Sequence, residues 1–142
     1  MSAPLTLSAE FRKLVEARME QTLRGIEETL NEILEKQKIA PKDLKDELDS
    51  LHEIFILLFQ KWSLEILYTL LLKNTSGFGG LKKVLGVNSR TLSDKLKLLQ
   101  THGYIARNVQ AGPPLRVEYT LTSKGKNTVL LALPLLYYST AT

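Results

Sequence analysis

The sequence of 142 residues contains no cysteine, and this absence removes several kinds of chemistry at once. A chain without thiols forms no disulfide bond, binds no metal through thiolates, and offers neither a cysteine nucleophile nor a cysteine redox switch. Because disulfides belong to oxidising compartments, a chain without them is expected to be cytoplasmic.

Long apolar runs are missing as well. The first residues, MSAPLTLSAEFRK, lack a basic segment followed by an apolar core, so they do not resemble a secretory signal peptide. The run VLLALPLLYY (129–138) near the C-terminal end is shorter than the ~20 residues that a bilayer-spanning helix needs. We therefore expect no association with a membrane.

Residue types that build catalytic and metal sites are scarce. The histidines are His52 and His102, and no group of His, Asp and Glu has the spacing of metal ligands. No Gly-rich loop follows a predicted strand, as a phosphate-binding loop would, and no nucleophile stands beside a base. We expect no enzyme activity, no metal and no cofactor.

The chain does have an uneven distribution of charge. Residues 1–72 carry nine Lys or Arg and thirteen Asp or Glu, a net charge of −4. Residues 73–126 carry ten basic residues against Asp94 and Glu118 alone, a net charge of +8. A compact basic segment indicates a polyanionic partner such as nucleic acid, although a merely solvated surface would also carry such charges.

Apolar residues in the N-terminal part recur at helical spacing and predict one long helix from Ser8 to about Lys38. Such a helix gains little stability alone, so its apolar stripe is expected to pack on a second helix or a second chain. Pro41 opens the next helix, whose segment IFILLF (54–59) is apolar all round and is expected to be buried. The stripe consists of Phe11, Val15, Met19, Leu23, Ile26, Leu30 and Ile33.

The remaining chain predicts three short helices, a β-hairpin and a last helix. The helices are expected over 64–72, 78–85 and about 88–102, with Ser63 and Asn88 as N-caps. KNTSG is predicted to be a loop, and alternation around AGPP predicts a hairpin over about 104–121. Thr122 is expected to cap the last helix, which Pro134 would kink or end. The fold class is therefore mainly α with a small β-hairpin.

A helix, a turn, a helix and a two-stranded wing form the winged helix-turn-helix pattern, in which the second helix enters the DNA major groove. At 100° per residue, Leu92, Leu96 and Leu99 share one face of helix 88–102. The other face combines cations, which can read guanine, with hydroxyl groups that bond to bases or phosphates. Asp94 is expected to orient Arg90 or, less favoured, to read a cytosine amino group. The candidate DNA-contacting residues of this helix are Ser89, Arg90, Thr91, Ser93, Asp94 and Lys97.

Further basic residues flank this helix along the chain. Lys82 and Lys83 precede it by one helix and are expected near the phosphate backbone. Arg107 and Arg116 lie on the two strands of the wing and are expected to touch the backbone or the minor groove. Lys124 and Lys126, at the start of the last helix, are also expected near phosphates. Any single lysine could instead be a solvated surface charge.

Three stretches, KWSLEILYTLL (61–71), GFGGLKKVLGVNSRTLSDKLKLLQTHGYIAR (77–107) and PPLRVEYTLTSKG (113–125), resemble the HxlR-type winged helix-turn-helix transcriptional regulators. The similarity covers about residues 60–130, and the last stretch is the most specific. The residues that match the family pattern are Trp62, Phe78, Leu81, Leu92, Leu96, Lys97, Leu99, Pro113, Pro114, Val117, Glu118, Tyr119, Leu121 and Thr122.

This resemblance implies a homodimeric DNA-binding regulator of the broad MarR-like group, whose terminal helices pair the two chains. The sequence departs from the pattern at Leu115, an extra residue at the wing tip, and at Gly77, where an arginine is usual. Some members of the family sense oxidants or aldehydes through a cysteine near the N-terminus, and a chain without cysteine lacks that mode of induction.

We therefore expect a sequence-specific transcriptional regulator that binds double-stranded DNA as a homodimer; no particular effector ligand is indicated. The alternatives are a winged-helix module that binds protein through its acidic segment, and an architectural DNA binder with little sequence preference. The expected regions are 1–60 for helical dimerisation, 61–126 for DNA binding and 127–142 for an apolar dimerisation helix. Residues 129–138 are expected to pack on the N-terminal helix of the same or a partner chain.

Overall fold

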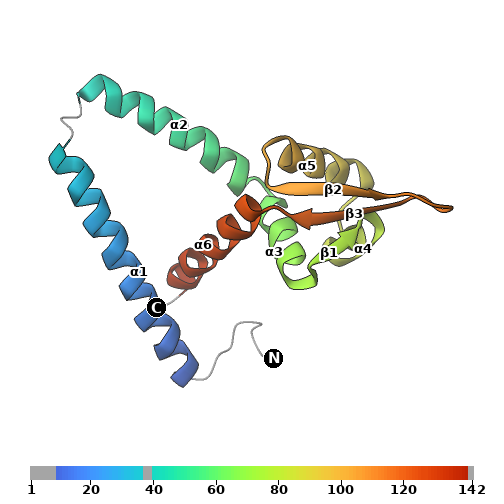
Figure 1. The fold of residues 1–142 in the computed structure, drawn as a ribbon, viewed down its shortest axis with the longest axis horizontal. Coiled ribbons are helices and arrows are strands. Elements are labelled where there is room, and N and C mark those ends of the chain that lie inside the picture. Colours follow the sequence, from blue (N-terminus) through green and yellow to red (C-terminus); the bar gives the residue numbers. More distant parts are fainter. Residues whose placement is uncertain (1–8, 37–39, 141–142) are drawn as a thin grey trace. The chain divides into compact units, whose positions relative to one another are not determined.

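A computed structural model describes residues 9–36 and 40–140 of the chain, with side chains over 13–36 and 40–135. Six helices and three strands lie in these ranges, so the fold is mainly α with a small sheet, as predicted (Figure 1). In chain order they are α1 (Ala9–Lys36), α2 (Pro41–Phe59), α3 (Ser63–Lys73), β1 (Thr75–Gly77), α4 (Phe78–Leu85), α5 (Ser89–Thr101), β2 (Ile105–Gln110), β3 (Arg116–Leu121) and α6 (Ser123–Thr140).

The chain divides into two compact units, residues 1–49 and residues 50–142. The first unit contains α1, a helix of 28 residues, which confirms the predicted long helix within the described range. The predicted ends, Ser8 and Lys38, lie outside the described residues. Four residues of the predicted apolar stripe are about half exposed, namely Leu23, Ile26, Leu30 and Ile33.

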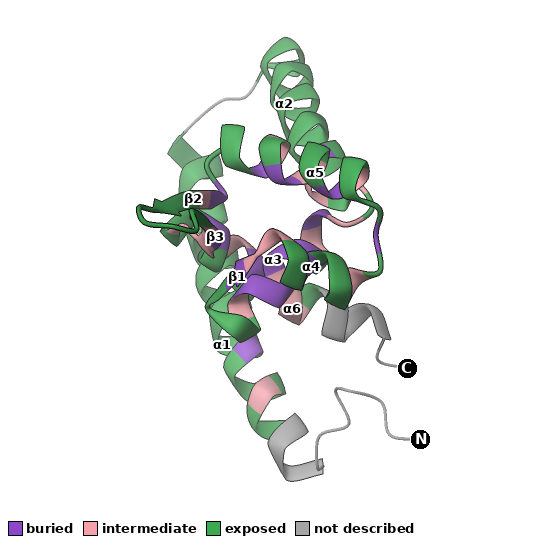
Figure 2. Cartoon of the chain, turned by 90° about the vertical axis from the view of Figure 1, so that its right-hand side faces the viewer, coloured by how far each residue is buried: buried purple, intermediate pink, exposed green. Residues whose placement is uncertain are grey.

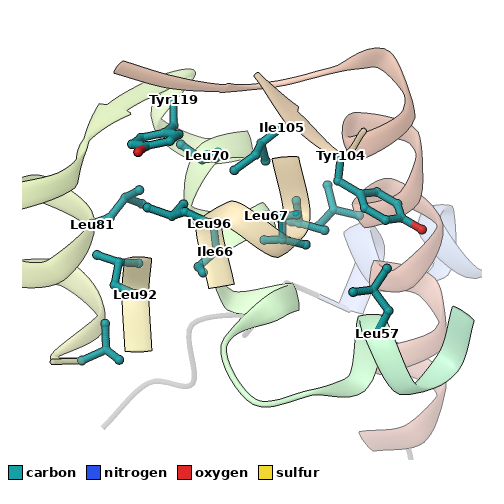
Figure 3. Packing of buried hydrophobic residues seen from close by; sticks show 13 residues of the cluster. Leu57, Ile66, Leu67, Leu70, Leu81, Leu92, Leu96, Tyr104, Ile105 and Tyr119 are labelled. Atoms are coloured by element: carbon teal, nitrogen blue, oxygen red, sulfur yellow. The ribbon is translucent and has the colours of Figure 1, made fainter. Parts of the chain in front are cut away.

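Helix α3 lies at the centre of the core of the second unit. Its residues Ile66, Leu67 and Leu70 are no more than 1% exposed, and it contacts α4, α6 and β3. Tyr104, just before β2, and Tyr119 on β3 close the core around these helices (Figure 3). Each fully buried Leu or Ile contributes roughly 1.5–3 kcal/mol by leaving water, so this cluster fixes how the short helices pack.

The wing is an antiparallel hairpin with β2 and β3 paired from Ile105↔Leu121 to Gln110↔Arg116, as the alternating pattern predicted. A third strand, β1, pairs with the other edge of β3, which gives the strand order β1-β3-β2. The loop predicted for KNTSG is therefore partly wrong, because Thr75–Gly77 forms this short strand. Three residues are too few to show alternation, and the strand forms only because β3 supplies hydrogen-bonding partners.

Helix α2 differs from its prediction in the segment 54–59. Leu57 is buried at 9% exposure, whereas Phe55 and Phe59 are 52% and 55% exposed, and Ile54 and Ile56 are also about half exposed. The prediction that the whole segment is buried is therefore wrong for the single chain. A helix that is apolar all round needs cover on every side, and the core of the second unit covers one side only.

The junction between α2 and α3 is a tight bend around Trp62. Helix α2 ends at Phe59, and Trp62 takes the left-handed backbone conformation with φ of 80°. Its amide donates a hydrogen bond to Oε2 of Glu65 at 3.2 Å, one turn into α3. Trp62 is thus the N-cap, and Ser63, the predicted cap, is the first residue of the helix.

Helix α6 begins where the sequence predicts and continues further. The Thr122 hydroxyl accepts a hydrogen bond from the Gly125 amide at 3.0 Å, which confirms the predicted cap. The helix runs through Pro134 to Thr140, so it does not end at the proline, and the kink that was the other expectation stays a prediction. Val129 is buried in the core of the second unit, while Leu131 is 66% exposed. The predicted packing of residues 129–138 on the N-terminal helix stays a prediction.

Within the described residues, no single helix is long and apolar enough to cross a membrane. Helices α2 and α3 reach that length and composition only as a pair that is bent by 63°. Much of α3 is committed to the core of the winged unit, because five of its residues are buried there.

Candidate nucleic-acid interface

Helices α4 and α5 and the turn between them form the helix-turn-helix. The turn begins at Gly86, whose φ of 65° is the left-handed conformation that glycine adopts without steric cost. The Gly86 amide donates to the Lys82 carbonyl at 2.9 Å and closes α4. Oδ1 of Asn88 accepts a hydrogen bond from the Thr91 amide at 2.8 Å, which confirms the predicted N-cap of α5.

The inward face of α5 consists of three leucines that hold its rotation. Leu92, Leu96 and Leu99 are 0%, 2% and 0% exposed, as their spacing predicted. Figure 2 shows the buried side of α5 turned to the interior and its exposed side turned outward. Rotating the helix would expose three leucines at roughly 1.5–3 kcal/mol each, so the orientation of the other face is set by the core.

The outward face of α5 carries the residues predicted to contact DNA. Arg90 and Lys97 are exposed and give this face two positive charges, with Asp94 as one negative charge. Thr91 is half-buried and lies at the edge of the face. No ion pair joins Arg90 to Asp94 in the described part of the chain, so the role given to Asp94 stays a prediction. Ser89 and Ser93 are exposed between the charged residues.

Lys95 is the basic residue of α5 that faces the protein. It is half-buried, and its Nζ donates a hydrogen bond to Oε1 of Gln60 at 2.5 Å. Gln60 lies in the bend between α2 and α3, and its carbonyl accepts from the Ser63 amide at 3.2 Å. Lys95 thus joins α5 to that bend, a role that no pattern in the sequence indicates.

Helix α4 presents two adjacent lysines. Lys82 and Lys83 are exposed in its last turn, and their expected place near the phosphate backbone stays a prediction. Cations in the last turn also suit the negative end of the helix dipole. A Cβ atom at Gly80, on the same helix, would lie 2.9 Å from Oγ of Ser76 on β1, so the serine side chain would have to move.

The wing carries the two predicted arginines at different positions along its length. Arg107 pairs with Tyr119 near the middle of the hairpin, and Arg116 pairs with Gln110 at the last paired position before the tip. Both arginines are exposed, and so are the tip residues 111–115. Glu118 on β3 accepts a hydrogen bond from the Thr75 hydroxyl at 3.2 Å, so this carboxylate is held beside β1.

The two lysines at the start of α6 differ in their contacts. Nζ of Lys124 donates to the His102 carbonyl at 2.9 Å and lies 4.4 Å from the centroid of the Tyr104 ring. Lys126 is exposed. The structure therefore places Lys124 at the C-terminal end of α5, an arrangement that the sequence pattern does not indicate because it joins segments 22 positions apart.

Other sites find little support in the described part of the chain. No group of three or more His, Cys, Asp or Glu side chains there could hold a metal ion. A shallow apolar groove of about 240 Å³ lies in the second unit between the end of α2, the start of α3 and α6. The residues that line it are Phe55, Leu58, Phe59, Leu64, Thr128, Leu131, Ala132 and Leu135.

Comparisons with known sequences match the same part of the chain. A family profile described as HxlR-like helix-turn-helix matches residues 57–136. YdzF of Bacillus subtilis (strain 168), an uncharacterized HTH-type transcriptional regulator, is 40% identical over 68 residues, which cover 47% of this chain and 62% of the relative. An uncharacterized HTH-type transcriptional regulator of Synechocystis sp. is 41% identical over 80 residues, 54% of this chain and 58% of the relative. Each match spans less than two thirds of the relative.

Solved structures share the fold. A transcriptional regulator of the MarR family from Enterococcus faecalis V583 superposes with a TM-score of 0.56 at 30% identity, over 64% of this chain and 82% of the other. Diamide-treated YodB from Bacillus subtilis superposes with a TM-score of 0.57 at 22% identity, over 72% of this chain and 94% of the other. At this identity the likeness is one of fold alone. The profile covers more than half of the chain and coincides with its winged helix-turn-helix, so the chain belongs to the HxlR-like helix-turn-helix family.

Proposed function

We propose that the protein is a sequence-specific DNA-binding transcription regulator that acts as a homodimer in the cytoplasm, with α5 as its recognition helix. The observation that carries the proposal is the outward face of α5, where Arg90 and Lys97 are exposed while the opposite face is fixed by buried leucines. A rigid helix with exposed cations and hydroxyl groups has the form and chemistry that the major groove accepts. The relatives described as HTH-type transcriptional regulators support the same function.

The neighbouring elements supply contacts that do not depend on base sequence. Lys82 and Lys83 on α4 would bind phosphates beside the groove that α5 enters. Arg107 and Arg116 would bind the backbone or the minor groove along the wing. Gly77 leaves β1 without the phosphate contact that an arginine would add, so α4 and the wing carry more of the non-specific binding.

Dimerisation is proposed through the terminal helices. Residues 127–142 carry no charged side chain, and the groove between α2 and α6 is lined by apolar residues. Leu131 and Phe59, which line that groove, are 66% and 55% exposed in the single chain. A second copy would cover these side chains, and two-fold symmetry would set two recognition helices about 34 Å apart, one turn of DNA.

Selection of bound fragments from random duplex DNA tests the proposal directly. We expect enrichment of an inverted repeat with half-sites one helical turn apart, and affinity that falls steeply with salt, by about 0.9 log units per phosphate contact for each log unit of salt. Tight binding without enrichment would favour an architectural DNA binder instead. No shift of any duplex at low salt would favour a module that binds protein.

A further inference from the structure

The first turn of α6 is fastened to the C-terminal end of α5 by hydrogen bonds to consecutive carbonyl groups. Helix α5 ends at Thr101, and the chain turns at Gly103, where φ is 80°. Nζ of Lys124 donates to the His102 carbonyl at 2.9 Å, and the Thr122 hydroxyl donates to the Gly103 carbonyl at 2.6 Å. The last carbonyls of the helix, those of Leu98, Leu99 and Gln100, accept from the amides of residues 102–104. The carbonyls of the turn that follows α5 are bonded by another segment instead.

The next carbonyl along the chain takes part as well. The Thr122 amide donates to the Tyr104 carbonyl at 3.1 Å, and the Thr122 hydroxyl lies 3.1 Å from the same oxygen. That hydroxyl also accepts from the Gly125 amide at 3.0 Å, so a single threonine caps α6 and binds the chain that leaves α5. We call Thr122, Lys124 and Gly125 the α6 clamp.

Gly125 allows the two segments to approach as closely as they do. A Cβ atom at this position would lie 1.9 Å from the Tyr104 carbonyl oxygen and 2.9 Å from its carbon. Both atoms belong to the backbone, so they cannot move aside as a flexible side chain would. Any larger residue at position 125 would push α6 away from the end of α5.

The Lys124 side chain has a specific environment although the residue is exposed. Its ammonium group lies 4.4 Å from the centroid of the Tyr104 ring, within the range of a cation–π contact. It also lies at the C-terminal end of α5, where the helix dipole is negative and favours a cation. A phosphate would have to compete with these three groups for the same ammonium.

We propose that the α6 clamp positions the recognition helix, and that Lys124 acts in it as a positioning residue and not as a phosphate contact. This inference rests on the proposed DNA binding by α5. Because α6 carries part of the apolar surface proposed for dimerisation, the clamp makes α6 and α5 move together. The angle at which each recognition helix meets its half-site then depends on the contact between Lys124, Thr122 and the chain at 102–104.

A matched pair of lysine variants tests this role. Lys124→Met and Lys126→Met make the same change two residues apart on α6, and Lys126 is exposed without a side-chain role in the clamp. Affinity is measured for the selected site and for random duplex over a series of salt concentrations. For K124M we expect the ratio of specific to random affinity to fall about tenfold, which is within the range that one base contact contributes. The salt slope, which is the change of log affinity with log salt concentration, should equal that of the wild type. K126M should keep the wild-type ratio.

A phosphate contact by Lys124 predicts the opposite pattern. Affinity would then fall equally on both duplexes, and the salt slope of K124M would decrease by about 0.9. Either this pattern or a wild-type ratio in K124M overturns the inference.

A second variant tests the clamp without removing a charge. Gly125→Ala keeps every cation, so its salt slope should equal that of the wild type while its specific-to-random ratio falls. A wild-type ratio in a folded G125A protein, checked by circular dichroism, contradicts the clamp. If the wild-type protein binds no duplex at all, the proposed function has failed; if it binds its site and only the variants behave otherwise, this inference alone has failed.

Discussion

Lys95 and Gln60 are joined by a hydrogen bond of 2.5 Å between Nζ and Oε1, although 35 positions separate them in the chain. The bond links the middle of α5 to the bend between α2 and α3. Arg90 and Lys97, on the same helix, are exposed instead. The three cations of α5 therefore divide into one that holds the helix in place and two that face outward, and this division can be tested residue by residue.

Arg90 is predicted to determine base choice. Replacing it by Ala should lower discrimination at one position of each half-site by about 1–3 kcal/mol, because alanine cannot form the bidentate hydrogen bonds of arginine to guanine. Selection of bound sequences with the variant measures this change as reduced enrichment at that position. An unchanged sequence preference in the variant would remove Arg90 from the set of base-reading residues.

Lys82 and Lys83 are predicted to act on the phosphate backbone. The double replacement by Ala should weaken binding to specific and random duplexes alike, and the salt slope should decrease by up to about 1.8, or about 0.9 for each phosphate that is no longer neutralised. Titrations at several salt concentrations give the slope. A weakening confined to the specific site would instead assign these lysines to base recognition.

Lys95 is predicted to stabilise the fold and to leave DNA electrostatics unchanged. Lys95→Met keeps the aliphatic stem but loses the hydrogen bond to Gln60, so the free energy of unfolding should fall by about 1 kcal/mol. Denaturant unfolding measures this change, and the salt slope of DNA binding serves as the control. A slope that decreases as it does for a phosphate contact would show that Lys95 turns outward on DNA.

Leu96 and Lys97, adjacent residues on the inward and outward faces of α5, are predicted to affect different properties, stability for the first and DNA affinity for the second. Leu96→Ala removes a side chain that is 2% exposed, and it should lower the free energy of unfolding by about 2–5 kcal/mol. Lys97→Ala changes an exposed residue, and its effect on stability should stay within about 0.5 kcal/mol while DNA affinity falls. Thermal unfolding and gel shifts measure both effects. A stable L96A protein with weakened DNA binding, or an unstable K97A protein, would show that the faces of α5 are wrongly assigned.

Leu131 on α6 is predicted to lie in the dimer interface. Leu131→Glu places a charge in the apolar groove, where it would have to be desolvated on dimerisation, so the variant should sediment as a monomer at micromolar concentration. Leu115→Glu is the matched control, because Leu115 is 71% exposed at the wing tip and lies outside the groove. Dimers that persist in L131E would place the interface elsewhere.

The sequence predicts what depends on local periodicity and capping. The leucine spacing of α5, its Asn88 cap and the alternation in the wing all have short-range causes, and the structure agrees with each of them. The burial of segment 54–59 could not be predicted, because an apolar composition does not tell whether the same chain or another covers the helix.

Long-range contacts explain the remaining differences. Strand β1 has three residues and forms only because β3 lies beside it. Lys95 and Lys124 look like their exposed neighbours in the sequence, yet their side chains reach hydrogen-bond acceptors that only the folded chain brings near. A lysine stem is long and flexible, so its target cannot be read from its position on a helix alone.

The register of the sheet determines where the wing tolerates changes in length. The ladder between β2 and β3 ends at Gln110↔Arg116, so residues 111–115 lie beyond every paired position. Insertions there, such as the extra residue that the resemblance to the family assigns to Leu115, would lengthen the tip and leave the strand alignment unchanged. An insertion at 75–77 would shift the pairing of β1 with β3 and displace α4, which follows directly. Insertions and deletions in this sheet should therefore be confined to the wing tip.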